Sequence, residues 1–381
     1  MSERKKKIVV LGSTGSIGQS TLKVARHLSD RIEVVGLGAA RSAEKLAEQL
    51  SETGARHACL SDVDAVQSLE GQLNADIQIY SGDEGLIELA TLEEADMVLV
   101  AIVGIAGLRP ALAALEAGKD LAVASKEILV MAGEQVMETA RRTGAKVLPV
   151  DSEHNAIFQC LEGRSAQEVS RLILTASGGP FRQLPASELI KVSPKDALKH
   201  PTWDMGPKIT IDSATLFNKG LEMIEARWLF EVEMDRVDVI VHPQSIIHSM
   251  VEFTDNSVLA QLSVTDMCFP IQYAITWPER LANPLPPLDL ASIATLDFET
   301  PRFEDFPALN LARRAGEVGG SLPAVMNAAN EVAVARFLEE GCTFPKIWEH
   351  VEAVMDAHEV ILKPDLDELI AADSWARTVS P

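Results

Sequence analysis

The chain has 381 residues, of which 47% are hydrophobic and 24% charged, as in a globular protein with two or three domains. Its net charge of −22 argues against nucleic acid or an anionic membrane surface as the partner, so an anionic ligand requires a local basic pocket. The sequence has four widely spaced cysteines, no C-x-x-C, no membrane-length apolar run and no visible cleavable signal, so we expect a cytoplasmic protein without a membrane partner.

The first predicted strand, residues 8–11, leads into a glycine loop and an amphipathic helix to about residue 28. The loop has the spacing G-x-x-G-x-x-G instead of G-x-G-x-x-G. Small residues still let backbone N–H groups approach a pyrophosphate at the helix N-terminus, although an ordinary strand–helix turn is the alternative. The residues predicted to bind a cofactor here are Gly12, Ser13, Thr14, Gly15, Ser16, Ile17 and Gly18.

A second strand, residues 32–37, is followed by Arg41 and Ser42. Sites for NAD usually carry an acid near this place, which bonds the ribose 2′-hydroxyl and would repel a 2′-phosphate. A guanidinium binds such a phosphate through parallel N–H donors. The pattern therefore favours NADPH over NADH, with Arg41 and Ser42 as cofactor residues. The alternative is that Arg41 is a solvated loop charge.

Strand and helix patterns then alternate, which predicts an α/β fold with a mostly parallel sheet covered on both faces. The strands are expected at 58–60, 77–80, 97–102, 121–124 and 147–150. Because ligands gather beyond the carboxyl ends of such strands, Ala101, Ser125 and Glu127 should border the cofactor crevice. Lys126 is either a cation for the ligand or a surface lysine at a helix start.

Two carboxylates, Asp151 and Glu153, directly follow the strand at 147–150, where a helical pattern begins. Two acids one residue apart could bind a single hard cation, which prefers oxygen ligands. The alternative is an ordinary helix N-terminus, where acids satisfy free N–H groups and the helix dipole. The pair alone does not decide between these interpretations.

Beyond Asp151 the pattern becomes α+β. The strand at 172–175 runs into Ser177-Gly-Gly, which is either a turn or a nest of N–H donors for an anion. The loop 199–208 combines two prolines with Trp203, which makes it a lid candidate. Permanent anchoring of that loop on the core is the alternative. Residues 208–213 are expected to form a strand.

A helix from about 218 to 230 places Asn218, Glu222 and Glu225 on one face, which is either solvated or part of a site. Strands are expected at 237–241, 246–253 and 258–264, the last two as a hairpin around Asp255 and Asn256. The exposed edge of this sheet could pair in a dimer. The proline-rich segment 278–307 is predicted to be a linker, and helical patterns dominate from residue 309.

Six motifs occur in order along the chain: Leu11-Gly-Ser-Thr-Gly-Ser-Ile-Gly18, Leu148-Pro-Val-Asp-Ser-Glu-His-Asn-Ala-Ile-Phe158, Ser177-Gly-Gly-Pro-Phe181, His200-Pro-Thr-Trp-Asp-Met-Gly206, Asn218-Lys-Gly-Leu-Glu222 and His242-Pro-Gln-Ser-Ile-Ile-His-Ser249. In this order they resemble the 1-deoxy-D-xylulose-5-phosphate reductoisomerase family, and the likeness extends from the start of the chain to its end. The resemblance implies a Rossmann-like NADPH-binding domain (1–150), an α+β catalytic domain (151–277) with the lid 199–208, the linker 278–307, and a C-terminal helical bundle (308–381).

The resemblance also implies a reaction, the conversion of 1-deoxy-D-xylulose 5-phosphate to 2-C-methyl-D-erythritol 4-phosphate in the non-mevalonate route to isoprenoid precursors. The implied cofactors are NADPH and Mg²⁺ or Mn²⁺, with Co²⁺ as a further option. The implied partner is a small sugar phosphate, and the implied assembly is a homodimer.

Site residues are carried over by position. Asp151, Glu153 and Glu222 resemble the metal ligands and act in catalysis with Lys126. Ser152 and Lys126 resemble contacts to the oxygen-bearing carbons of the substrate. The implied phosphate pocket consists of Ser177, Ser213, Asn218 and Lys219, with His200 and His248 beside it. Trp203 and Met205 correspond to the lid, and Gly206 is a further implied cofactor contact. Ala40 and Ser125 depart from the family's usual Gly and Asn, which bears on the geometry of the cofactor site.

Two other functions remain open at this point. A simple NADPH-dependent dehydrogenase of a semialdehyde or hydroxy acid, such as a homoserine type, would need a nucleophilic cysteine or another acid/base set, and no cysteine lies in a motif. A non-catalytic NADPH sensor would have no reason to keep three convergent carboxylates and a phosphate pocket.

Overall fold

The computed structural model describes residues 4–73, 76–200, 202–203 and 205–379. The chain divides into two compact units. The first comprises Met1–Ile128, Glu134–Asn155 and Asp266–Leu285, and the second comprises Leu129–Gly133, Ala156–Thr265 and Pro286–Pro381. Both units are α/β in composition, and the predicted α/β class is confirmed.

The first unit is built on a seven-stranded sheet of order β4-β3-β2-β1-β5-β6-β7, formed by the described residues. All of its strand pairs are parallel. Its strands are β1 (Lys6–Leu11), β2 (Ile32–Ala39), β3 (His57–Leu60), β4 (Gln78–Ser81), β5 (Met97–Val100), β6 (Asp120–Val123) and β7 (Val147–Pro149). The central strands are buried along almost their whole length, as expected for a parallel sheet covered on both faces. This is the predicted Rossmann-like fold.

The order of the strands reverses between β1 and β5, because β1 pairs with β2 on one side and with β5 on the other. Such a switch point opens a crevice at the carboxyl ends of the strands. The glycine loop follows β1 there, and Ala101 follows β5. The helices connected with this sheet are α1 (Ser16–His27), α2 (Ala43–Thr53), α3 (Val66–Glu70), α4 (Gly82–Ala90), α5 (Leu108–Glu116), α6 (Lys126–Thr143), α7 (Ser152–Leu161) and α11 (Cys268–Thr276).

The second unit contains a four-stranded sheet of order β11-β10-β8-β9 among the described residues. Its strands are β8 (Val169–Ala176), β9 (Val237–Val241), β10 (Ile247–Phe253) and β11 (Val258–Leu262). The β10–β11 hairpin is antiparallel, as predicted, and Asn256 in its turn has a positive φ of 65°. At the edge, Val258 and Leu259 of β11 are exposed.

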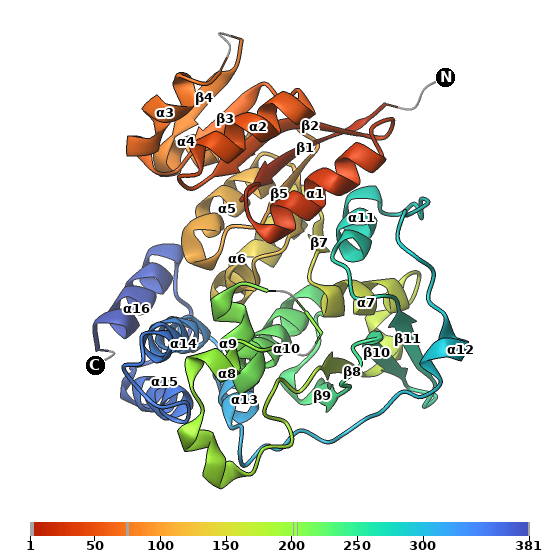
Figure 1. Cartoon of the computed structure of the whole chain (residues 1–381), viewed down its shortest axis with the longest axis vertical. Coiled ribbons are helices and arrows are strands. Elements are labelled where there is room, and N and C mark those ends of the chain that lie inside the picture. The colour runs from red at the N-terminus through yellow and green to blue at the C-terminus, as the bar shows by residue number, and fades with distance from the viewer. Residues whose placement is uncertain (1–3, 74–75, 201, 204, 380–381) are drawn as a thin grey trace. The chain divides into compact units, whose positions relative to one another are not determined.

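The helices of the second unit are α8 (Pro194–Ala197), α9 (Pro207–Thr215), α10 (Phe217–Phe230), α12 (Leu290–Ile293), α13 (Ala308–Val318), α14 (Leu322–Leu338), α15 (Lys346–Ala357) and α16 (Leu366–Val379). The C-terminal helices, blue in Figure 1, pack around α14, which contacts α13, α15 and α16. They share one hydrophobic core with β8–β10 and α10. No helix of the described residues is long and apolar enough to cross a membrane.

One predicted element is wrong: residues 208–213 form part of α9 instead of a strand. Gly206 lies at the N-cap and Pro207 begins the helix, where the fixed φ of proline favours the first turn. The alternation of β-branched residues fits a strand equally well, but burial of Ile211 and Ala214 in the core of the unit decides for a helix. The irregular part of the lid candidate therefore ends at Gly206.

Residues 297–302 of the proline-rich segment 278–307 make several contacts beside the end of β9 in the second sheet. Glu299 forms a β-bridge with Val241 at the end of β9, with a backbone hydrogen bond in each direction. Arg302 donates hydrogen bonds to the backbone carbonyls of Arg182 and Leu184. Part of the predicted linker thus runs along the sheet.

Candidate active site

The glycine loop fits tightly into the first unit because two of its glycines lie where no side chain has room. A Cβ on Gly12, whose φ is +87°, would lie 2.4 Å from the carbonyl oxygen of Ala101. A Cβ on Gly18 would lie 2.4 Å from the carbonyl oxygen of Gly12. Gly15 differs, since the nearest atom to its Cβ would be 3.4 Å away. The loop therefore lies against the end of β5, as the cofactor prediction requires.

Polar groups from α2 set the orientation of the loop peptides. Gln49 donates a 2.9 Å hydrogen bond to the Ser13 carbonyl, and Lys45 donates one of 2.9 Å to the Thr14 carbonyl. The carbonyl and the N–H of a trans peptide point in opposite directions, so the bond from Gln49 aims the Thr14 N–H away from α2. Lys45 was missed in the sequence, because no motif marks it.

A buried hydroxyl at the loop supports its role as a ligand cradle. Ser13 Oγ is buried and has no hydrogen-bond partner among the described residues. Gly15, Ser16, Thr14 and Ile17 are exposed or half-buried, so the loop presents surface to a ligand. Helix α1 begins at Ser16 without a side-chain cap, so its first-turn N–H groups and dipole favour an anion.

Arg41 and Ser42 lie just beyond β2. The Arg41 side chain is largely exposed, with Nε 3.5 Å from Oδ2 of Asp62. Ser42 is the N-cap residue of α2, but its hydroxyl makes no capping hydrogen bond. A guanidinium and a hydroxyl that the helix does not use are thus presented together. Their binding of a 2′-phosphate stays a prediction.

The ends of β5 and β6 bring the next predicted residues together. The Ala101 N–H donates to the carbonyl of Leu11, and Ser125 Oγ donates to the carbonyl of Ile102. Ser125 is the N-cap of α6, and Glu127 lies in the first turn of that helix. Both side chains are buried. The sequence therefore placed these residues correctly at one edge of the sheet.

Lys126 is not a surface lysine. Its side chain is 8% exposed, and Nζ donates a 2.8 Å hydrogen bond to Oδ2 of Asp151. Asp151 directly precedes α7, and its Oδ1 accepts from the Ser152 N–H at 3.0 Å, as at a helix N-terminus. Ser152 Oγ in turn donates to Oε2 of Glu153. Oδ1 of Asp151 thus accepts from the first N–H of α7, while its Oδ2 faces the lysine.

The predicted polar face of α10 is buried, which excludes the solvated alternative. Glu222 is 0% exposed; its Oε1 accepts a 2.6 Å hydrogen bond from Asn218 Nδ2, and its Oε2 pairs with Lys219 Nζ. Glu225 is buried as well. A buried carboxylate is costly unless it is paired, so this glutamate is held by neighbours one turn away. Met223 and Ile224 are buried too, so the helix is enclosed nearly all round.

His200 connects two hydroxyls of the predicted phosphate pocket. Its Nε2 lies 3.0 Å from Ser177 Oγ, at the end of β8, and 3.0 Å from Ser213 Oγ, in α9. Its Nδ1 accepts hydrogen bonds from the N–H groups of Thr202 and Trp203. Because Nδ1 accepts, the neutral ring carries its proton on Nε2. Burial lowers the pKa of His200 to about 4, which keeps the ring neutral.

The described part of the lid lies close to this group. The Trp203 ring centroid is 6.3 Å from that of His248, which is buried. Met205 is half-buried, and Gly206 is the exposed N-cap of α9. Pro201 and Asp204, also in the predicted lid, lie outside the described residues. Asn218 and Lys219 contact Glu222, and their place in the phosphate pocket stays a prediction.

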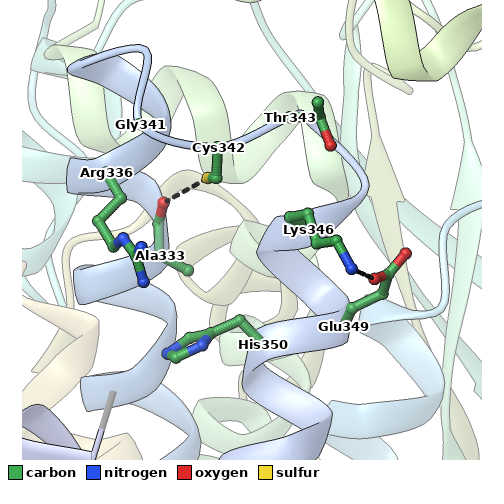
Figure 2. Close-up of a pocket in the computed structure, with 8 residues that line it drawn as sticks. All are labelled: Ala333, Arg336, Gly341, Cys342, Thr343, Lys346, Glu349 and His350. Carbon is green, nitrogen blue, oxygen red and sulfur yellow. Dashed lines mark hydrogen bonds and ion pairs between the residues drawn. The ribbon is translucent and has the colours of Figure 1, made fainter. Parts of the chain in front are cut away.

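A separate cavity of about 530 Å³ lies in the second unit between α14 and α15. None of the predicted site residues lines it; its lining is Ala333, Arg336, Gly341, Cys342, Thr343, Lys346, Glu349 and His350. Figure 2 shows Lys346 turned to Glu349 and the Cys342 thiol directed at the Ala333 carbonyl. This cavity is therefore distinct from the predicted site residues at the strand ends and on α9 and α10.

The predicted site residues are divided between the two units. Lys126, Asp151 and Glu153 belong to the first unit, and Glu222 belongs to the second with the phosphate-pocket residues. Carboxylate oxygens, which all three predicted ligands offer, are what Mg²⁺ prefers. Their binding of one ion stays a prediction.

Three family models match the chain in succession. They are described as 1-deoxy-D-xylulose 5-phosphate reductoisomerase (residues 8–133), 1-deoxy-D-xylulose 5-phosphate reductoisomerase C-terminal domain (residues 147–230) and DXP reductoisomerase C-terminal domain (residues 262–379). Together they match well over half of the chain. The predicted resemblance is confirmed along nearly the whole chain.

Individual relatives agree with these models. A 1-deoxy-D-xylulose 5-phosphate reductoisomerase of Halothermothrix orenii is 51% identical over 98% of this chain and 97% of its own length. The solved Zymomonas mobilis enzyme in complex with NADPH is 43% identical with a TM-score of 0.94, over 99% of this chain and 98% of that one. A reductoisomerase solved with NADPH, fosmidomycin and magnesium is 40% identical with a TM-score of 0.94, over 98% and 97%.

Proposed function

The chain belongs to the 1-deoxy-D-xylulose 5-phosphate reductoisomerase family, and from that premise we propose how its own residues perform the reaction. The protein is an NADPH-dependent oxidoreductase that converts 1-deoxy-D-xylulose 5-phosphate to 2-C-methyl-D-erythritol 4-phosphate with a divalent metal ion. This reaction supplies isoprenoid precursors. The observation that carries the function is 51% identity over 98% of the chain.

NADPH binds at the glycine loop and supplies the hydride. Gly12 and Gly18 leave room where side chains would clash, and Ser13 Oγ is buried there without a partner among the described residues. These observations fit a pyrophosphate against the start of α1. We assign the 2′-phosphate to Arg41 and Ser42, with Lys45 as an additional cation near the loop. Ala101, Ser125, Glu127 and Gly206 complete the proposed cofactor site.

Asp151, Glu153 and Glu222 are the proposed ligands of the metal ion, because each offers the carboxylate oxygens that such an ion prefers. The family's magnesium complexes support Mg²⁺, with Mn²⁺ or Co²⁺ as substitutes to be tested. A divalent cation supplies Lewis acidity to adjacent ketone and hydroxyl oxygens of a substrate. Lys126 holds Oδ2 of Asp151 in place and adds a buried positive charge beside it.

The remaining residues bind and enclose the sugar phosphate. Ser152 faces its hydroxylated carbons in this proposal, and Ser177, Ser213, Asn218 and Lys219 bind its phosphate. His200 orients both serine hydroxyls through Nε2. Trp203 and Met205 cover the substrate and exclude water, and the His248 ring lies near that of Trp203. Exclusion of water and fixed geometry are what a carbon–carbon rearrangement requires.

A thiol-dependent dehydrogenase is disfavoured by the state of the cysteines. Burial raises the pKa of Cys59 to about 12 and that of Cys268 to about 11. Because the thiolate is the nucleophile, such cysteines are inert at neutral pH. The two groups also lie outside the proposed site.

We further propose that the protein is a cytoplasmic homodimer. The exposed edge strand β11 presents Val258 and Leu259, and an open apolar edge favours pairing with another strand. The buried free cysteines are typical of a reducing compartment. Light scattering should give a dimer mass for the native protein and a monomer for Leu259→Lys, whereas an unchanged mass would exclude this edge as the interface.

The proposed site is tested by NADPH oxidation with 1-deoxy-D-xylulose 5-phosphate, with and without a chelator. We expect turnover only with substrate and divalent metal together. Glu222→Gln keeps the size of the side chain but removes its charge, so it should abolish turnover while leaving NADPH affinity nearly unchanged. Equal loss of turnover and NADPH affinity would refute the metal assignment. Glu317→Gln, an exposed substitution on α13, is the matched control.

A further inference from the structure

We propose that Asn330 of α14 is a positioning residue for the phosphate pocket, because it fixes helix α9 through Asp212 and thereby holds the hydroxyl of Ser213. The inference rests on the proposed function, in which Ser213 binds the substrate's phosphate. It gives the C-terminal helices a part in substrate binding, although none of the site residues predicted from the sequence lies in them.

The contact itself is buried and charged. Asn330 Nδ2 donates a 2.8 Å hydrogen bond to Oδ1 of Asp212. Oδ2 of the same carboxylate lies 2.6 Å from Lys208 Nζ, one turn earlier in α9. Asp212 is 1% exposed and Asn330 is 0% exposed. A carboxylate removed from water needs its oxygens satisfied, so α9 is held where both donors can reach Asp212.

The orientation of the amide is fixed by the same surroundings. Asn330 Oδ1 is buried without a hydrogen-bond partner among the described residues, so the contact with Asp212 is the polar interaction that its side chain makes there. Turning the amide over would place that oxygen against a carboxylate. Asn330 therefore acts on α9 as a donor only.

Asp212 and Ser213 are consecutive, so they point in different directions from α9, about 100° apart around the helix. While Asp212 meets α14, Ser213 Oγ lies 3.0 Å from Nε2 of His200. A Cβ on Gly179, whose φ is +68°, would lie 2.9 Å from the carbonyl oxygen of Ser213. Helix α9 is thus confined between the Ser177–Gly179 loop on one side and Asn330 on the other. A small displacement toward α14 would move Ser213 away from His200.

The chain offers a matched control one turn away. Asn327 lies in the same helix, is equally buried, and also has a buried Oδ1 without a partner among the described residues. Its Nδ2 donates instead to Glu331, at 2.9 Å. Glu331 pairs with Arg377 of α16, so Asn327 serves contacts among the C-terminal helices. A general loss of stability in α14 should therefore affect both asparagines, but a positioning effect only Asn330.

The experiment compares Asn330→Ala, Asn327→Ala and Ser213→Ala in the full-length enzyme with saturating NADPH and Mg²⁺. For Asn330→Ala we expect KM for the sugar phosphate and the inhibition constant of inorganic phosphate to rise about tenfold, the effect of one charge-assisted hydrogen bond. Its kcat should stay within about twofold, and its NADPH affinity should not change. Asn327→Ala should lower the melting temperature without raising KM.

A rescue variant separates positioning from damage. The exchange Asn330→Asp with Asp212→Asn puts the donor on α9 and the acceptor on α14, so it should return KM to within about threefold of the native value. Asn330→Asp alone places two buried carboxylates against each other, so it should raise KM more than Asn330→Ala does. Should Asn330→Ala fail to fold, Asn330→Ser replaces it in the comparison.

The outcomes distinguish this inference from the function on which it rests. If Ser213→Ala raises KM but Asn330→Ala and Asn327→Ala behave alike, the inference is wrong and the phosphate pocket stands. If Ser213→Ala leaves KM unchanged, the pocket assignment fails and the inference fails with it. A rise in KM for Ser213→Ala and Asn330→Ala alone, reversed by the exchange, supports both.

Discussion

Lys126 Nζ donates a hydrogen bond of 2.8 Å to Oδ2 of Asp151, at the edge where the paired strands β6 and β7 end. The two residues are 25 positions apart in the sequence; Lys126 is buried and Asp151 is half-buried. Attraction between opposite charges is much stronger in such surroundings than in water. The pair therefore links the start of α6 to the proposed metal-binding carboxylates.

Replacement of Lys126 by Met should reduce kcat by about 10²–10³-fold, the usual effect of losing one electrostatic group that contacts the reacting atoms. Affinity for Mg²⁺ should not fall, because the substitution removes a positive charge beside the ligands. Steady-state kinetics and a metal titration measure the two effects. Lys119→Met, a lysine that bonds the Glu93 carbonyl in the same unit, is the control. A tenfold loss of metal affinity in Lys126→Met would contradict the assignment.

The glycine loop allows two kinds of effect to be separated. Gly18→Ala forces a Cβ to within 2.4 Å of backbone atoms, so it should destabilise the fold and weaken NADPH binding together. Gly15→Ala meets its nearest atom at 3.4 Å and should cost less than about 1 kcal/mol of stability. Its NADPH affinity should nevertheless fall at least about tenfold, because the backbone must approach the pyrophosphate. Thermal unfolding and NADPH titration test both, and unaltered affinity in Gly15→Ala would remove the loop from the cofactor site.

Arg41→Ala should narrow the preference for NADPH over NADH by about tenfold, since an exposed charge-assisted contact to a phosphate contributes roughly 1–2 kcal/mol. The effect should appear as a lower kcat/KM with NADPH and an unchanged value with NADH. Arg26→Ala, an exposed arginine that pairs with Glu52 on α2, is a control in the same unit. Equal loss with both cofactors would show that Arg41 does not distinguish them.

The pKa of His200, lowered from 6.5 to about 4 by burial, predicts a dependence of stability on pH. Between pH 6.5 and 4 the imidazole of His200 is protonated in the unfolded chain but neutral in the folded chain. The contribution of His200 to the free energy of unfolding is therefore complete above pH 6.5 and is lost as the pH falls toward 4. Protonation would also end the acceptance of the Trp203 N–H by Nδ1.

His200→Asn removes the titrating ring but keeps an acceptor near the position of Nδ1. Denaturant unfolding at several pH values should show a smaller loss of stability between pH 6.5 and 4 for this variant than for the native protein. Exposed His27→Asn should behave like the native chain. Parallel curves for His200→Asn and the native protein would mean that His200 titrates normally.

Much of the fold follows from local pattern. The alternation of apolar runs with amphipathic helices predicts the parallel sheet, and the strands found lie within one or two residues of the expected ends for β3, β6 and β7. The prediction of a strand at residues 208–213 was wrong because alternating β-branched residues suit both a strand and a buried helix. In that case Pro207 was the informative residue.

The candidate site was predictable only in part. The sequence shows Asp151 at a strand end, and it shows Asn218 and Glu222 at helical spacing. In the structure Asn218 donates a 2.6 Å hydrogen bond to Glu222. Burial was not visible: the same patterns allowed Lys126 to be a surface lysine and the α10 face to be solvated. Lys45 and Asn330 carried no motif at all.

By itself the sequence determined the strand–helix alternation, the glycine turn and the identity of the acids, because periodicity and turn chemistry act over a few neighbouring residues. Tertiary structure alone decided that Lys126 is withdrawn from solvent and that Asn330 meets Asp212 across 118 residues. The physical reason is that the hydration of a side chain and its distant partners depend on how whole elements pack, which no local pattern specifies.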